Sequence, residues 1–84
     1  MSYAVSIRRS AQRELEAIPS PFHENITDKM LSLGATRRPP GCKILQGSDK
    51  WRIRIGNYRL IYEIDDSAQA VIVIKIAHRS DVYR

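Results

Sequence analysis

Between residues 51 and 64, apolar and polar side chains alternate in two stretches that flank a Gly-Asn pair. Such alternation is typical of β-strands with one buried face, and a two-residue loop of this type is typical of a tight hairpin. The segment therefore predicts a β-hairpin with Gly56 and Asn57 as its loop. No other pattern constrains the fold as much, because the loop fixes which residues face each other across the two strands.

The predicted pairing separates an apolar face of the hairpin from a basic one. The apolar pairs are Ile55 with Tyr58, Ile53 with Leu60 and Trp51 with Tyr62. On the other face Arg54 lies directly opposite Arg59, with Arg52 two residues along. Like charges in directly opposed positions destabilise a sheet by roughly 0.2–1 kcal/mol. The cluster therefore indicates an anion-binding face, and solvated arginines without a ligand are the plain alternative.

The first part of the chain predicts one strand and two helices. Residues 3–7 alternate as a strand does, and apolar residues then recur at helical spacing. The expected N-cap of the first helix is Ser10, and Pro19 stops that helix. The second helix is expected to begin with Pro21 at its first position and to end at Gly34. Two helices joined this tightly predict a helical hairpin.

The second part of the chain adds strands. Residues 43–45 form a short stretch between two loops, and residues 71–76 are apolar on both faces except for Lys75, as in a central strand. The order β-α-α-β-β-β predicts an α+β domain. In it, the helical hairpin packs on one face of a mainly antiparallel four-stranded sheet.

Alternation along the central strand extends the basic face. If Ile72, Ile74 and Ile76 face the helices, three residues fall on the open face with the arginine cluster: Lys75, Ala77 and Arg79. Four arginines and a lysine would then converge on one concave surface. Guanidinium groups bind phosphate oxygens bidentately and keep their charge at physiological pH, so this surface is predicted to bind phosphate.

Size and charge agree with a small domain that binds an anionic partner. The 84 residues are predicted to form a single domain, 1–84, too small for a roomy substrate cavity. The net charge is +5, and all of the excess lies in residues 37–59, where seven basic residues accompany Asp49 alone. A concentrated basic segment fits a phosphate-rich partner or an acidic protein.

The number of cysteines and the hydropathy of the N-terminus indicate the cellular compartment of the protein. Cys42 is the only cysteine, so no intramolecular disulfide can form, and one Cys with two His leaves little for a zinc site. The N-terminal residues lack a long apolar run behind a basic start, so neither a signal peptide nor a membrane anchor is expected. These features predict a cytoplasmic protein with no membrane partner.

Two motifs in the second half of the chain resemble those of a known family. They are R-I-G-x-Y-R at residues 54–59 and H-R-x-D-V-Y at residues 78–83. With the opening strand and the segment 39–45, they make nearly the whole chain similar to the RelE family of toxins, within the RelE/ParE superfamily of type II toxin–antitoxin systems. The resemblance implies a curved, mainly antiparallel sheet backed by two helices.

The resemblance also implies a ribosome-dependent mRNA endonuclease. Such toxins enter the A site of the small ribosomal subunit, cut the mRNA codon displayed there and inhibit translation. The 2′-hydroxyl of the RNA is the nucleophile and a cyclic phosphate is left, so no metal and no other cofactor is implied. The implied partners are the ribosome, mRNA and a cognate RelB-like antitoxin, whose complex with the toxin can bind operator DNA.

The same resemblance assigns catalytic roles. Arg59 and Arg79 align with family arginines that position and neutralise the scissile phosphate, and Tyr83 aligns with a tyrosine near the 2′-hydroxyl. Arg52 and Arg54 align with a basic pair that is lysine in the best-known member. Because arginine keeps its proton, these two residues are expected to stabilise charge on the phosphorane and not to act as the general base. Proton transfer is then assigned to Tyr83.

Four further residues are candidates for substrate binding: Lys43, Lys50, Lys75 and His78. Lys43 either contacts the RNA backbone or is only solvated. His78 is the alternative to Tyr83 for proton transfer, because histidine is a common general acid or base, although alternation points its side chain to the core side. The aromatic residues of the hairpin share a face with isoleucine and leucine, so they are expected in the core and not as platforms for RNA bases.

Two other functions fit the same sequence. One is a ParE-like toxin, which shares the fold but inhibits DNA gyrase through protein contacts. Such toxins generally lack the catalytic basic set, whereas this chain has arginine at positions 52, 54, 59 and 79. The other is a binding module whose basic face only docks an acidic antitoxin or duplex nucleic acid. Its binding would weaken steeply with salt and it would cut no RNA.

Overall fold

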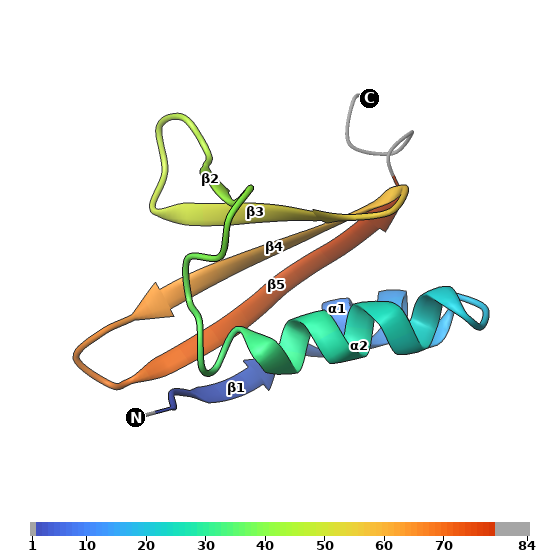
Figure 1. The fold of residues 1–84 in the computed structure, drawn as a ribbon, viewed down its shortest axis with the longest axis horizontal. Coiled ribbons are helices and arrows are strands. Elements are labelled where there is room, and N and C mark those ends of the chain that lie inside the picture. Colours follow the sequence, from blue (N-terminus) through green and yellow to red (C-terminus); the bar gives the residue numbers. More distant parts are fainter. Residues whose placement is uncertain (1, 79–84) are drawn as a thin grey trace.

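The computed structural model describes residues 2–78, which form one five-stranded sheet with two helices on one side (Figure 1). In chain order the elements are β1 (Ala4–Ile7), α1 (Arg9–Glu16), α2 (Phe22–Ser32), β2 (Lys43–Ile44), β3 (Lys50–Ile55), β4 (Tyr58–Asp65) and β5 (Ala70–His78). The order of strands across the sheet is β1-β5-β4-β3-β2. The first strand pairs with the last in parallel, and the other pairs are antiparallel. This arrangement confirms the predicted α+β class and the mainly antiparallel sheet.

The sheet has one strand more than predicted. Residues Lys43–Ile44, expected to be a stretch between loops, form β2 and pair with Arg52 and Trp51 at the edge of β3. A two-residue strand is too short to show alternation, so only its pairing with β3 reveals it. The prediction of four strands was therefore wrong, and the described sheet has five.

The hairpin has the predicted register. Ile55 pairs with Tyr58 and Arg54 with Arg59, and the pairing continues without a shift to Lys50 and Glu63. Gly56 has φ of 60°, a left-handed conformation that a hairpin loop of the II′ type requires at its first position. The loop thus fixes which side chains reach each face of β3 and β4.

The central strand differs from the prediction. Between β4 and β5, Ile61 pairs with Lys75 but Tyr62 pairs with Val73, so Ile74 is an extra residue on β5. This β-bulge reverses the alternation along the strand. The side chains that face the core are therefore Val71 and Val73 before the bulge and Ile76 after it. The predicted run Ile72, Ile74 and Ile76 was wrong for its first two members.

The helices supply the second layer of the core. Ala11 and Leu15 of α1 and Ile26 and Met30 of α2 are buried against the sheet, at the three- and four-residue spacing of a helix face. The helix starts differ from the prediction. Arg8, not Ser10, is the N-cap of α1, and Pro21 is the N-cap of α2 instead of its first residue. In the described part of the chain, residues 2–78, no helix has the length and apolar character needed to cross a membrane.

Candidate functional site

The face of the sheet opposite the helices carries the predicted basic residues in two transverse rows. One row crosses β2, β3, β4 and β5 as Lys43, Arg52, Ile61 and Lys75. The next row contains Arg54, Arg59 and Ala77. Opposed residues of neighbouring strands point to the same face, so the pairing itself brings these cations together.

Lys43, Arg52 and Arg54 form the accessible part of this face. Arg54 and Lys43 are exposed and Arg52 is half-buried. Within residues 2–78, none of the ion pairs between side chains involves these three residues. Their charges are thus not compensated by any described carboxylate, and the surface beside them attracts anions.

Arg59 has a different environment from the one predicted. It lies directly opposite Arg54, as the register required, but only 3% of its surface is exposed. Its predicted place on the face opposite the helices is confirmed, whereas the expectation that it is accessible there was wrong. Its guanidinium is a fixed positive charge beside Arg54, held within the sheet.

Lys75 is on the predicted row but its charge is neutralised. Its Nζ lies 2.9 Å from Oε2 of Glu14, and the other oxygen of that carboxylate accepts a hydrogen bond of 3.0 Å from the backbone N–H of Ile76. Glu14 therefore covers the edge of β5 beyond the point where β1 ends at Ile7. Lys75 thus shares a sheet face with the arginine cluster but has a glutamate partner, and its role in substrate binding stays a prediction.

Lys50 lies at the other end of β3 and is also paired. Its Nζ is 3.8 Å from Glu63, whose carboxylate also lies 3.7 Å from Arg8. Lys50 therefore shares a face of β3 with Arg52, two residues away, but has Glu63 as an ion-pair partner. Both contacts link exposed or half-exposed side chains and contribute little to stability.

His78 lies on the face that carries the core, as alternation predicted. It pairs with Tyr58 across β4 and β5, and the two rings meet edge to face with centroids 5.2 Å apart. Its neighbour Ala77 pairs with Arg59 on the opposite face. Two other candidates, Arg79 and Tyr83, lie outside the described residues, so their assigned roles stay predictions.

The aromatic residues of the hairpin belong to the core, as predicted. Tyr62 is fully buried, and Trp51 and Tyr58 are half-buried against the same cluster. Burial raises the pKa of Tyr62 far above its ordinary value. The Tyr62 hydroxyl donates a hydrogen bond of 2.7 Å to the carbonyl of Arg37, so the phenol is used for structure.

Sequence reasoning missed Lys29, which lies beside the arginine pair. A pocket of about 350 Å³ opens at the edge of β3 and is lined by Lys29, Pro40, Gly41, Lys43, Arg52, Ile53 and Arg54. Helical spacing places Lys29 next to the buried Met30, on the flank of the apolar stripe. That spacing carries no information on which strand the flank approaches.

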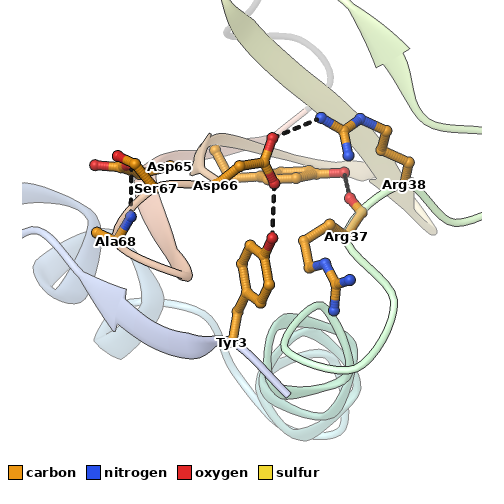
Figure 2. A network of polar contacts seen from close by, with 8 residues as sticks. Tyr3, Arg37, Arg38, Asp65, Asp66, Ser67 and Ala68 are labelled. Atoms are coloured by element: carbon orange, nitrogen blue, oxygen red, sulfur yellow. Dashed lines mark hydrogen bonds and ion pairs between the residues drawn. The ribbon is translucent and has the colours of Figure 1, made fainter. Parts of the chain in front are cut away.

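Two arginines of the basic segment serve the fold. The Arg37 guanidinium lies 4.0 Å above the ring of Tyr3, and that of Arg38 lies 5.2 Å from the ring of Trp51. Asp66 lies between Tyr3 and Arg38 (Figure 2). It accepts a hydrogen bond of 2.8 Å from the Tyr3 hydroxyl, and its carboxylate is 3.5 Å from the Arg38 guanidinium. The same hydrogen bond raises the pKa of Tyr3. These contacts hold the segment that leads from α2 to β2.

The fold and the basic face define a known class of protein. Residues 5–83 match the family model described as the ParE toxin of the type II toxin–antitoxin system parDE. The chain belongs to this RelE/ParE family of toxins. It is 30% identical to Toxin RelG of Mycobacterium tuberculosis over an alignment of 89 residues, which covers 100% of this chain and 99% of that protein.

Solved structures of RelE toxins have the same fold. The toxin–antitoxin complex RelBE2 of Mycobacterium tuberculosis matches with a TM-score of 0.84 and 26% identity, over 94% of this chain and 100% of that chain. The isolated RelE toxin of E. coli matches with a TM-score of 0.80 and 26% identity, over 98% of this chain and 92% of that one. These similarities agree with the family that the motifs of residues 54–59 and 78–83 indicated.

Proposed function

We propose that this protein is a toxin that cleaves mRNA in the ribosomal A site, by attack of the RNA's own 2′-hydroxyl on the adjacent phosphate. The observation that carries the proposal is the group Lys43, Arg52 and Arg54, whose charges have no acidic partner within residues 2–78. The similarity to RelG and to RelE toxins supports it, because the family is known for ribosome-dependent RNases.

In this proposal the arginines stabilise charge and do not transfer protons. Arg52 and Arg54 donate hydrogen bonds to the non-bridging oxygens, where negative charge grows in the transition state. Arg59, buried opposite Arg54, adds a fixed positive charge that raises the local potential. Arg79 neutralises the phosphate and Tyr83 transfers the proton, as the family resemblance implies. His78 becomes the weaker alternative, because it lies on the other face.

The partner that would control such a toxin is an antitoxin of the RelB type. The solved complexes RelBE2 of Mycobacterium tuberculosis and RelBE of E. coli each contain a toxin similar to this chain with its antitoxin. A net charge of +5 favours association with an acidic segment of such a protein.

Cleavage in programmed ribosomes tests the proposal. Primer extension on a defined mRNA is run with the wild type, the double variant Arg52→Gln/Arg54→Gln and the control Arg9→Gln/Arg13→Gln. The control makes the same change in charge at two exposed positions of α1. We expect A-site cuts with the wild type and the control, and a rate at least about 100-fold lower for the double variant. Equal rates for the two double variants would contradict the proposed site.

A ParE-like inhibitor of DNA gyrase is the second candidate. The family model that matches residues 5–83 is the one described for ParE, which favours this alternative. A supercoiling assay with purified gyrase separates the two functions. Inhibition of gyrase by the wild type, with mRNA left uncut in programmed ribosomes, would replace the RNase proposal with this one.

A further inference from the structure

The pocket at the edge of β3 receives cations from both sides of the sheet. Arg52 and Arg54 leave β3 on the face opposite the helices, whereas the intervening Ile53 is buried in the core. Lys29 comes from α2, in the helical layer, yet it lines the same pocket. The pocket therefore continues around the free edge of β3, where β2 no longer pairs with it beyond Arg52.

Within residues 2–78, no carboxylate compensates the charges in this pocket. Among the described residues, its lining contains four basic side chains and no acidic one. The positions three and four residues from Lys29 along α2 are Asn25, Ile26, Ser32 and Leu33, so no acidic neighbour of that spacing is available. This distinguishes Lys29 from Lys50 and Lys75, whose ammonium groups each have a glutamate partner.

The residues that line the pocket favour a phosphate group and not a base. Among residues 2–78, its apolar lining consists of Pro40 and Ile53 and includes no aromatic ring on which a base could stack. Such a site binds the backbone of a nucleic acid independently of its sequence.

The wall of the pocket between α2 and β2 is held in place before any ligand binds. The N–H of Cys42 donates a hydrogen bond of 3.1 Å to the carbonyl of Pro39, and Gly41 has φ of 89°. This is the geometry of a type II turn with proline and glycine at its two central positions. The Arg37 carbonyl accepts a hydrogen bond of 2.7 Å from the Tyr62 hydroxyl. The Arg38 guanidinium lies 3.5 Å from Asp66 (Figure 2). Binding therefore needs little ordering of this loop.

From these observations we propose, resting on the proposed RNA-cutting function, that Lys29 binds a phosphodiester of the RNA strand next to the one held by Arg52 and Arg54. The strand then passes from the open face of the sheet around the edge of β3 to α2. Lys29 is a positioning residue in this scheme, because it holds the strand and does not touch the reacting atoms.

The test measures how RNA binding depends on salt. The probe is a fluorescently labelled single-stranded hexaribonucleotide with 2′-O-methyl groups, which cannot be cut by 2′-hydroxyl attack. Its affinity is measured by anisotropy at several salt concentrations for the wild type, Lys29→Ala, Lys29→Arg and the control Arg13→Ala. Arg13 is an exposed cation of α1 that does not line the pocket.

Loss of one phosphate contact has a defined signature. Lys29→Ala is expected to weaken binding about three- to tenfold, and to lower the slope of log K against log salt by about 0.7. Lys29→Arg should keep the wild-type slope, and Arg13→Ala should change neither quantity. A slope for Lys29→Ala equal to that of the wild type would overturn the proposal.

Lys29 could instead bind a phosphate of ribosomal RNA, and a second measurement distinguishes this from binding to the substrate strand. Affinity for ribosomes without mRNA should be the same for Lys29→Ala and the wild type. A loss seen only with ribosomes, and not with the hexaribonucleotide, would overturn the assignment to the substrate strand. The hexaribonucleotide assay needs no cleavage, so its outcome is independent of the primer-extension test. The protein can lack RNase activity and still bind the hexaribonucleotide through Lys29. Equally, it can cut mRNA although Lys29 does not bind the strand.

Discussion

At Gly34 the backbone of the chain after α2 lies very close to the backbone just before β1. A Cβ atom added to Gly34 would lie 2.8 Å from the carbonyl oxygen of Tyr3, whose N–H donates a hydrogen bond of 2.7 Å to the Gly34 carbonyl. Backbone cannot yield as a flexible side chain can. We expect Gly34→Ala to lower the free energy of unfolding by about 1–3 kcal/mol in urea titrations. The exposed neighbour Thr36→Ala should stay within about 0.5 kcal/mol of the wild type, and equal effects of the two would contradict this.

The Tyr62 hydroxyl contributes to the free energy of unfolding, and this contribution depends on pH. Its phenol is buried and donates a hydrogen bond to the Arg37 carbonyl, so Tyr62→Phe should lower the free energy of unfolding by about 0.5–1.5 kcal/mol at neutral pH.

Burial raises the folded-state pKa of Tyr62 above the ordinary value of 10.0, so the unfolded chain loses this proton first as pH rises. The contribution of Tyr62 is complete below pH 10.0 and is lost above it. Stability of the wild type should therefore fall above about pH 10, and Tyr62→Phe should flatten that fall. An unchanged slope in denaturation at alkaline pH would contradict this assignment.

At the scale of elements, α1 stabilises the sheet through one carboxylate. Glu14 accepts a hydrogen bond from the N–H of Ile76 and pairs with Lys75, on the part of β5 that β1 does not reach. We expect Glu14→Ala to lower the free energy of unfolding by about 1–2 kcal/mol in thermal or urea unfolding, since a buried backbone donor loses its charged partner. Glu14→Gln keeps an acceptor oxygen and should lose less. If the alanine and glutamine variants were equally stable, the hydrogen bond to Ile76 would not be the cause.

The bulge in β5 changes which side chains of this strand share a face of the sheet. Because Ile74 is the extra residue, Lys75 pairs with Ile61 and Ala77 with Arg59, on the face of the arginine cluster. The predicted placement of Lys75 and Ala77 on that face is thus confirmed, although the isoleucines expected to face the helices were partly wrong. His78 falls on the other face for the same reason.

At the scale of the whole molecule, the strands from the two ends of the described chain are neighbours. Val5 of β1 pairs with Val71 of β5, and one core contains residues from both helices and from β3, β4 and β5. We predict that residues 1–84 unfold as a single cooperative unit. Urea unfolding followed by fluorescence of Trp51, the only tryptophan, should coincide with unfolding followed by far-UV circular dichroism. Two separate midpoints would indicate independent units and contradict the single domain.

The hairpin, its register and its apolar face could be predicted from the amino-acid sequence alone. Those features depend on local rules, because a two-residue loop fixes the pairing and alternation fixes the faces. The same rules gave the opposition of Arg54 and Arg59 and the place of Tyr62 in the core. The motifs of residues 54–59 and 78–83 added the family, which the comparisons confirmed.

Which cations of residues 2–78 have no acidic partner depends on the tertiary structure. Lys75 is neutralised by Glu14, which is 61 residues away in the sequence, and Lys29 reaches the β3 edge only because α2 packs there. Likewise, the burial of Arg59 and the extra residue in β5 depend on how layers and strands meet, which no local period encodes. Charge compensation acts over a few ångströms in space, whereas the sequence gives positions along the chain, so this part of the site required the fold.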